Sequence, residues 1–245
     1  MNNASLISFY ALAFIAEIIG TIGGFGSSLF FVPLANFYFD FHSVLGITAL
    51  FHLFSNASKI SLFKDGLDKN LIMWIGIPSV LFVIIGAIIS KYLDDQNAEL
   101  YIGLFLSFFS ILILSFPSIK LKANKNNSIA GGAASGLLAG LLGTGGAVRG
   151  LTMAAFNLEK NVFLASSAVI DMAVDSSRFV VYLVQGYIKF EYLYYIPFLI
   201  IIAYIGTLLG KRILNKLTQD YFRKASLILI LITGIVSLFQ AYFKV

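Results

Sequence analysis

The sequence predicts an all-α polytopic membrane protein built from two homologous halves. Three observations lead to this fold class. The 245-residue chain is 59% hydrophobic and only 12% charged, about half the charge of a soluble domain. Stretches without Asp, Glu, Lys or Arg approach the roughly 20 residues that cross a bilayer. They cover residues 70–90, 100–119, 192–210 and 225–243. The third observation is that the sequence aligns with itself at a constant offset.

The internal repeat involves glycines and polar residues alike. The aligned pairs are Gly20 with Gly140, Gly23 with Gly143, Gly26 with Gly146, Gly66 with Gly186, Gly86 with Gly206, Lys91 with Lys211 and Tyr101 with Tyr221. Because the register holds without a gap, we expect a duplicated architecture. We therefore divide the chain into a first membrane repeat at 1–118, a polar linker at 119–127 and a second membrane repeat at 128–245.

Each half contains four apolar segments. They cover 5–38, 43–63, 70–90 and 99–117 in the first half, and 128–156, 162–184, 192–213 and 221–242 in the second. The last three of each half have the length of ordinary transmembrane helices. Residues 5–38 would extend about 50 Å as one straight helix, which exceeds a bilayer of about 40–45 Å with its headgroups.

Glycine clusters indicate where the first segment of each half is interrupted. Glycine is poor in a helix interior and readily adopts positive φ. We expect breaks at 20–28 and 140–147. Close helix packing through Gly-x-x-x-Gly-like spacing is the alternative reading. The excess length and the repetition favour the breaks.

The distribution of Lys and Arg indicates that the broken segments fold back. If all eight segments crossed, the basic residues would divide evenly between the two sides. If each broken segment is a hairpin, Lys91, Lys189 and Lys244 share one side. The other side then holds Lys64, Lys69, Lys120, Lys122, Lys125, Lys160, Lys211, Arg212, Lys216, Arg223 and Lys224. The positive-inside rule places this richer side in the cytoplasm. We expect a hairpin plus three transmembrane helices per half, inverted repeats, and both termini outside.

Charged or titratable side chains also fall inside the apolar segments. They are Glu17, His52, Lys59, Arg149, Asp171, Asp175 and Arg178. Burial of a charge in hydrocarbon is costly unless the group is paired or faces a polar cavity. Broken helices at the midplane, arranged as inverted repeats, are a common plan of transporters. We therefore expect a polar path through the bilayer.

The two breaks are the expected binding site of a small anionic substrate. A helix that restarts after a break presents backbone N–H groups and its positive dipole end. The candidate substrate-binding residues are Gly23, Gly24, Gly26, Ser27, Ser28, Gly143, Thr144, Gly145, Gly146, Arg149, Asn56 and Arg178. Simple helix capping is the alternative for the two serines. A structural salt bridge with a buried acid is the alternative for Arg149.

Asp171, Asp175 and Arg178 share one helix face by their spacing, and this face is expected to point into the bundle. Two roles compete for it. In the first, the residues of this face form a structural ion-pair network that holds Arg149 and Arg178 in place. In the second, Asp171 or Asp175 carries a coupling proton. The repeat partners of Asp175 and Ser176 are Ser55 and Asn56, so both halves present polar groups at one depth.

Glu17 is expected to pair with a basic residue and, with His52, to organise the site or carry protons. A lone histidine is also a common packing residue. Lys59 is expected to snorkel if it lies near the membrane edge. We find no metal-ligand spacing, no nucleophile–base pair and no phosphate-binding loop after a strand. The sequence therefore predicts a protein that is not an enzyme, without cofactor, metal or nucleic acid as a partner.

The chain resembles the TauE/SafE family of membrane transporters, also called the sulfite exporter family. The resemblance lies in the glycine-rich segment from Gly20 to Pro33 and in its counterpart from Gly140 to Gly150. The pattern from Gly86 to Lys91, repeated at 206–211, adds to it. The chain departs from the common motifs at three positions. It has Phe25 in place of a glycine, Met153 in place of a proline, and an arginine at 149.

The resemblance implies a secondary transporter in the lipid bilayer of a prokaryotic cytoplasmic membrane. Its substrate would be sulfite, an organosulfonate or a related sulfur-containing or carboxylate anion, with proton coupling as an option. An anion channel is the alternative function. An intramembrane enzyme lacks a recognisable reactive set, and a scaffold without flux leaves the buried charges unexplained.

Overall fold

The computed structural model describes residues 3–92, 95–116 and 121–243, and within these ranges every regular element is a helix. The α-helices are α1 (Asn3–Gly23), α2 (Ser28–Ala35), α3 (Phe41–Leu62), α4 (Lys69–Ile89), α5 (Asp95–Ser115), α6 (Lys125–Leu142), α7 (Gly146–Ala155), α8 (Lys160–Val184), α9 (Ile196–Leu214) and α10 (Gln219–Phe243). Two short 3-10 helices, η1 (Ser90–Tyr92) and η2 (Phe190–Tyr195), flank α4 and α9. The predicted all-α fold class is confirmed.

The first break lies between α1 and α2 and is built on glycine. Gly24 and Gly26 have φ values of 78° and 90°, in the left-handed region that glycine enters without steric cost. The chain folds back on itself here. A side chain at Gly20 would overlap the backbone of Gly26 and Ser27. The predicted break at 20–28 is therefore present, although α1 continues through Gly20.

The second break lies between α6 and α7. Gly143 ends α6 with a φ of 74°, and its N–H donates to the carbonyl of Ala139 at 3.0 Å. The start of α7 returns along α6, because a side chain at Gly145 would overlap the carbonyl of Ser135. Gly140 lies inside α6. The break predicted at 140–147 is thus confirmed and shorter than expected.

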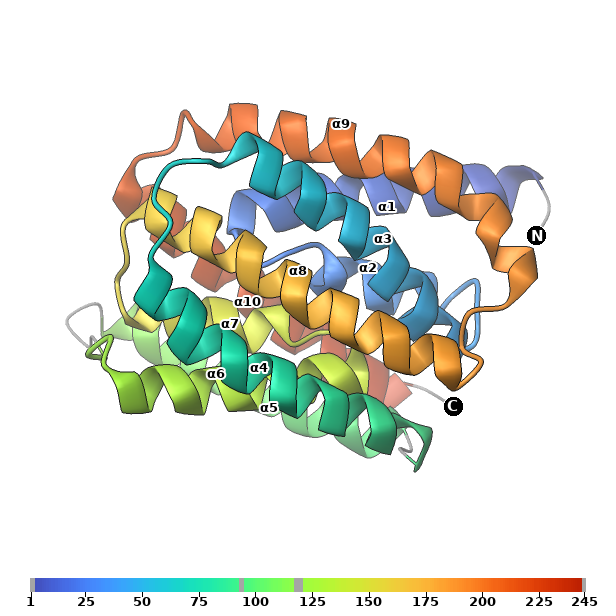
Figure 1. Ribbon diagram of the computed structural model, residues 1–245, viewed down its shortest axis with the longest axis horizontal. Coiled ribbons are helices and arrows are strands. Elements are labelled where there is room, and N and C mark those ends of the chain that lie inside the picture. Colours follow the sequence, from blue (N-terminus) through green and yellow to red (C-terminus); the bar gives the residue numbers. More distant parts are fainter. Residues whose placement is uncertain (1–2, 93–94, 117–120, 244–245) are drawn as a thin grey trace.

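The helices pack in a reciprocal pattern across the predicted halves. Helix α1 packs against α9, whereas α6 packs against α4, so the first helix of each predicted half lies on the third apolar segment of the other. Helices α3 and α8 meet in the centre, and α5 packs against α10. Figure 1 shows these long helices running side by side along the bundle. The division into 1–118, 119–127 and 128–245 stays a prediction, and α6 already begins within the predicted linker.

Helices α4 and α6 approach each other more closely than side chains would allow. A Cβ atom at Gly132, Gly136 or Gly140 would overlap a carbonyl oxygen of α4, from Ile75, Ser79 and Val83 respectively. These positions recur at the helical repeat on both helices. The alternative reading of the glycine spacing, close helix packing, therefore also holds for α6.

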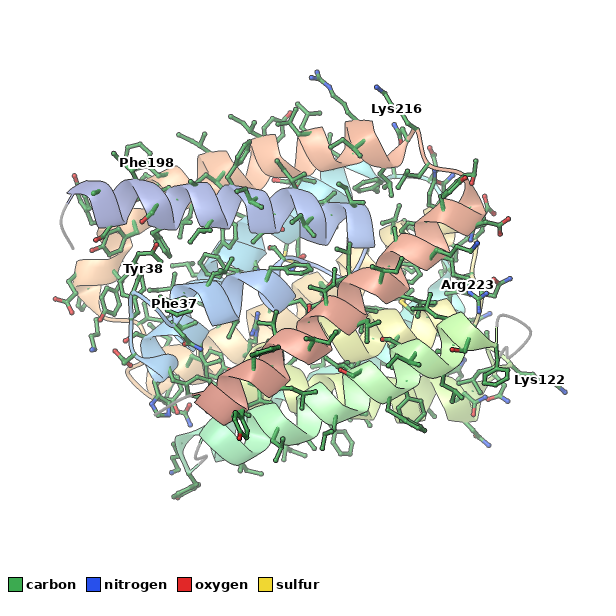
Figure 2. All side chains as sticks on the ribbon, turned by 180° about the vertical axis from the view of Figure 1, so that it is seen from behind. Phe37, Tyr38, Lys122, Phe198, Lys216 and Arg223 are labelled. Atoms are coloured by element: carbon green, nitrogen blue, oxygen red, sulfur yellow. The ribbon has the colours of Figure 1, made fainter. Side chains whose placement is uncertain are left out.

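The two ends of the bundle differ in character. Figure 1 shows both termini at the same end. At the opposite end the loops after α3, α7 and α9 meet: Lys160 Nζ donates to the carbonyl of Leu217 at 2.9 Å, and Lys211 Nζ donates to that of Leu62. We call it the basic end. Figure 2 shows Lys122, Lys216 and Arg223 at this end and Phe37, Tyr38 and Phe198 at the other. This arrangement supports the hairpin prediction, while the inverted orientation of the halves stays a prediction.

Four helices of the described chain are long and apolar enough to cross a membrane. They are Ala4–Gly23, Lys69–Tyr92, Phe190–Leu214 and Gln219–Phe239. Helices α3 and α8 have comparable lengths, but they carry many buried polar residues, among them His52, Asn56, Lys59, Asp171, Asp175 and Arg178. The predicted multi-pass membrane protein agrees with these spans.

Candidate functional site

Three ion pairs lie buried at the centre of the bundle. They are Lys59 with Glu17 (3.1 Å), Arg149 with Asp171 (2.5 Å) and Arg178 with Asp175 (2.6 Å). All six side chains are buried, and they come from α1, α3, α7 and α8. The charged residues that the sequence placed inside the apolar segments are therefore paired with one another.

Glu17 is the most heavily hydrogen-bonded of these groups. It lies on α1, before the first break, and is fully buried. Its carboxylate accepts from Thr21 (3.3 Å), Ser27 (2.5 Å), Ser55 (2.6 Å) and Thr207 (2.9 Å), besides the ammonium of Lys59. The expected pairing of Glu17 with a basic residue is confirmed.

Lys59 does not snorkel to the membrane edge. Only 7% of the residue is exposed, and its ammonium donates to Ser55 Oγ at 2.6 Å as well as to Glu17. The expectation that Lys59 snorkels was wrong because it treated α3 as an isolated helix. The ion pair forms only when α1 packs beside α3.

Ser27 connects Glu17 to the second half of the chain. Its Oγ lies 2.5 Å from Glu17 Oε2 and 3.0 Å from His52 Nε2. On the other side of the imidazole ring, His52 Nδ1 lies 3.6 Å from Asp175 Oδ2. Ser27 makes no side-chain cap on α2, so the capping alternative is wrong for this residue. A continuous chain of polar contacts runs from α1 through α3 to α8.

The sequence spacing reveals no nucleophile–base pair, but the fold places Ser27 Oγ 3.0 Å from His52 Nε2. The separation of the two residues in the sequence hides this contact. Ser27 is fully buried, and its hydroxyl already donates to the Glu17 carboxylate at 2.5 Å. The geometry therefore suits proton transfer along hydrogen bonds rather than nucleophilic attack.

Arg178 fixes the centre of the second half. Its guanidinium donates to Asp175 through Nε at 2.6 Å and to the carbonyl of Gly143 through Nη1 at 3.2 Å. Carbonyls at a helix C-terminus lack partners within the helix and favour a cation. Asn56 of α3 donates to the same Asp175 carboxylate at 2.6 Å. Asn56 and Arg178 thus hold the site together.

The guanidinium of Arg149 on α7 is likewise bound to neighbouring side chains. Its Nη2 contacts both oxygens of Asp171, and its Nε donates to Ser167 Oγ at 3.1 Å. The residue is 1% exposed. Of the alternatives for Arg149, the structure shows the salt bridge. The face that carries Asp171, Asp175 and Arg178 points into the bundle and forms the ion-pair network.

The two breaks meet at the centre. A side chain at Gly146, at the start of α7, would overlap the carbonyl of Phe25 in the first break. Beside the first break lies a small cavity of about 10 Å³, room for about one water molecule, lined by Thr21, Gly24, Gly26, Lys59, Phe63, Leu164, Ala168 and Asp171. Among the predicted binding residues, Gly24 and Gly26 line this cavity.

The other predicted binding residues do not line the cavity. They are Gly23, Ser27, Ser28, Asn56, Gly143, Thr144, Gly145, Gly146, Arg149 and Arg178. Sequence reasoning missed Lys59 and Thr21 as lining residues. In the described part of the chain, no group of three or more His, Asp or Glu side chains is placed to hold a metal ion.

Comparison with known proteins identifies the family. The model of the sulfite exporter TauE/SafE family matches residues 9–237. A probable membrane transporter protein of Methanocaldococcus jannaschii is 29% identical over 153 residues, which cover 56% of this chain and 57% of that protein. The chain thus spans little more than half the length of this curated relative. No solved structure matches. Since the family match extends over nearly the whole sequence, the chain is a multi-pass membrane protein that belongs to the sulfite exporter TauE/SafE family.

Proposed function

We propose that this protein is a secondary transporter of a small anion in a prokaryotic cytoplasmic membrane. The substrate class is sulfite, an organosulfonate or a related sulfur-containing or carboxylate anion. Family membership supports this class, as does the similarity to a probable membrane transporter. The observation that carries the proposal is the cavity beside the first break, which joins backbone at Gly24 and Gly26 to the ammonium of Lys59.

The cavity has the features that a small anion needs. Gly26, which lines the cavity, lies two residues before the first residue of α2, at the positive end of the dipole of that helix. Lys59 adds a full positive charge. Thr21, which also lines the cavity, carries a hydroxyl group. A sulfite or sulfonate oxygen accepts hydrogen bonds from an ammonium group and is attracted by the positive end of a helix.

The interior supports a carrier rather than a channel. A channel needs a wetted path with weak binding along it. Here the three ion pairs lie buried in the interior, on α1, α3, α7 and α8. Passage of an anion therefore requires rearrangement of the helices, as in alternating access.

Transport by the purified protein in proteoliposomes would test this function. We expect uptake of sulfite, thiosulfate or a sulfonate that saturates with concentration and responds to an imposed pH gradient. Empty liposomes are the control. Flux that rises linearly with concentration, without competition between anions, would support a channel instead. The absence of flux for every anion of the set would refute the proposed function.

A further inference from the structure

Three buried cations are candidates to bind the substrate, and they differ in what their donors already do. Arg178 uses Nε and Nη2 on Asp175 and Nη1 on the Gly143 carbonyl. Arg149 uses Nη2 on Asp171 and Nε on Ser167. Both arginines are 1% exposed, and neither lines the cavity.

Lys59 differs from both arginines because it lines the cavity beside the first break. An ammonium has three donors, and the contacts of Lys59 are with Ser55 and Glu17. Its remaining donor is available to a ligand, and the residue lines the cavity beside the first break. Phe63, which follows the last turn of α3, lines the same cavity. The cavity therefore lies toward the basic end, where anions concentrate.

Glu17 competes with any anion for Lys59. In its ionised form the carboxylate holds the ammonium at 3.1 Å. Transfer of a proton to Glu17 would remove this attraction. The new carboxylic acid could donate to Ser27 Oγ, 2.5 Å away, and the Ser27 hydroxyl could in turn donate to His52 Nε2 at 3.0 Å. A proton on Glu17 thus fits the existing network without loss of a hydrogen bond.

The other charges near Glu17 do not compete in the same way. Helix α9 contributes the uncharged Thr207, and α3 contributes His52. On α8, Asp171 and Asp175 are each matched by an arginine. Lys59 and Glu17 therefore form the pair whose separation would expose a cation to the cavity.

We propose that Lys59 is the cation that binds the transported anion, and that protonation of Glu17 releases it for this role. This proposal rests on the proposed transport function. One proton enters the site with one anion, so the charges of a monovalent anion and the proton cancel. The apparent affinity for the anion then falls about tenfold per pH unit above the pH at which Glu17 ionises.

Binding of methanesulfonate to the purified full chain tests the proposal, because the charge of this anion is constant over the range used. Dissociation constants would be measured from about pH 5 to pH 8 for the wild type, Glu17→Gln and Lys59→Met. We expect wild-type affinity to increase in acid. Glu17→Gln should bind equally well at every pH, and Lys59→Met should bind at least tenfold more weakly throughout.

Lys64→Gln is the matched control, because it removes an exposed charge beside the C-terminal end of α3. Its affinity should equal that of the wild type. If Lys59→Met is too unstable to purify, the double variant Glu17→Gln/Lys59→Met avoids an unpaired buried charge and should fold without binding. Wild-type affinity in a Lys59→Met protein, or the wild-type pH slope in Glu17→Gln, would overturn the proposal. Failure of the wild type to bind methanesulfonate, sulfite and thiosulfate would instead refute the proposed function.

Discussion

Nη2 of Arg149 lies 2.5 Å from each carboxylate oxygen of Asp171. This contact joins α7, which follows the second break, to the central helix α8. Because both side chains are buried, neither charge has water as an alternative partner. Arg149 is therefore a structural element of the core, and its effect on transport and its effect on folding have to be separated.

Arg149→Met should destabilise the protein by about 3–5 kcal/mol, since it leaves the Asp171 carboxylate buried and unpaired. The double variant Arg149→Met/Asp171→Leu should recover most of this loss, because it removes both charges. Thermal unfolding in detergent would measure the difference. A stable Arg149→Met protein that has lost anion binding would contradict this and favour Arg149 as the binding cation.

Gly136 on α6 should not tolerate a methyl group, since a Cβ atom there would overlap the carbonyl of Ser79 on α4. Gly136→Ala should cost about 1–3 kcal/mol through overpacking. Gly76→Ala is the matched control on the facing helix. A Cβ at Gly76 would lie 3.5 Å from Ile170, an ordinary contact, so this variant should be neutral or slightly stabilising. Equal melting temperatures for the two variants would refute the close packing of α4 and α6.

Ser27→Ala should interrupt the hydrogen-bonded chain between Glu17 and His52. Loss of a hydrogen bond to a charged group typically costs about 1.5–3 kcal/mol, and the pH response of uptake should weaken. Ser28→Ala is the control, because Ser28 is adjacent but outside this chain. Proteoliposome uptake at several external pH values would measure the effect. An unchanged pH response in Ser27→Ala would exclude Ser27 as a proton relay.

At the end opposite the basic end, Asp40 contacts Lys189 at 3.3 Å. Burial raises the pKa of Asp40, but hydrogen bonds from Ser43 and Lys189 outweigh it and hold the pKa below its usual value. The contact should therefore stabilise the protein above about pH 4 and lose its effect as the pH falls through the lowered pKa of Asp40. High salt should weaken it.

Asp40→Asn keeps a residue that can cap α3 but removes the charge. Its melting temperature should lie below that of the wild type near neutral pH and converge with it in acid. A gap between the two proteins that persists in strong acid would show that the charge of Asp40 is not the cause.

The sidedness of the bundle can be measured directly, because the chain has no cysteine. Single cysteines at Phe37 and Lys122 would lie at opposite ends (Figure 2). We expect a membrane-impermeant maleimide to label Phe37→Cys in intact cells, and Lys122→Cys only after lysis. Labelling of Lys122→Cys in intact cells would place the basic end outside and refute the orientation inferred from the positive-inside rule.

The fold class and the breaks could be predicted because they depend on local properties. The excess length of residues 5–38 and the glycine clusters are visible in the sequence. So is the shared face of Asp171, Asp175 and Arg178, which follows from helical spacing. The sequence alone also indicates that α3 and α8 carry polar residues of the core.

The partners within that core could not be predicted. Glu17 and Lys59 lie on different helices, and their contact depends on how α1 and α3 pack. The same holds for Ser27 and His52. Sequence spacing identifies which residues share a helix, whereas a cavity is formed by the remaining space between helices. For this reason the sequence favoured Arg149 and overlooked Lys59.

The glycine-lined contact between α4 and α6 limits which helices can move relative to one another. Since no side chains separate these two backbones, the helices have to shift together, although they lie on opposite sides of the predicted linker. Helices α1 and α9 also pack closely and also come from opposite sides of the predicted linker. Gly206 faces Glu17, and Gly210 faces Thr21. Each of these packed pairs thus takes one helix from each predicted repeat. A conformational cycle in this protein would divide the molecule between such mixed units, and the linker would not act as its hinge.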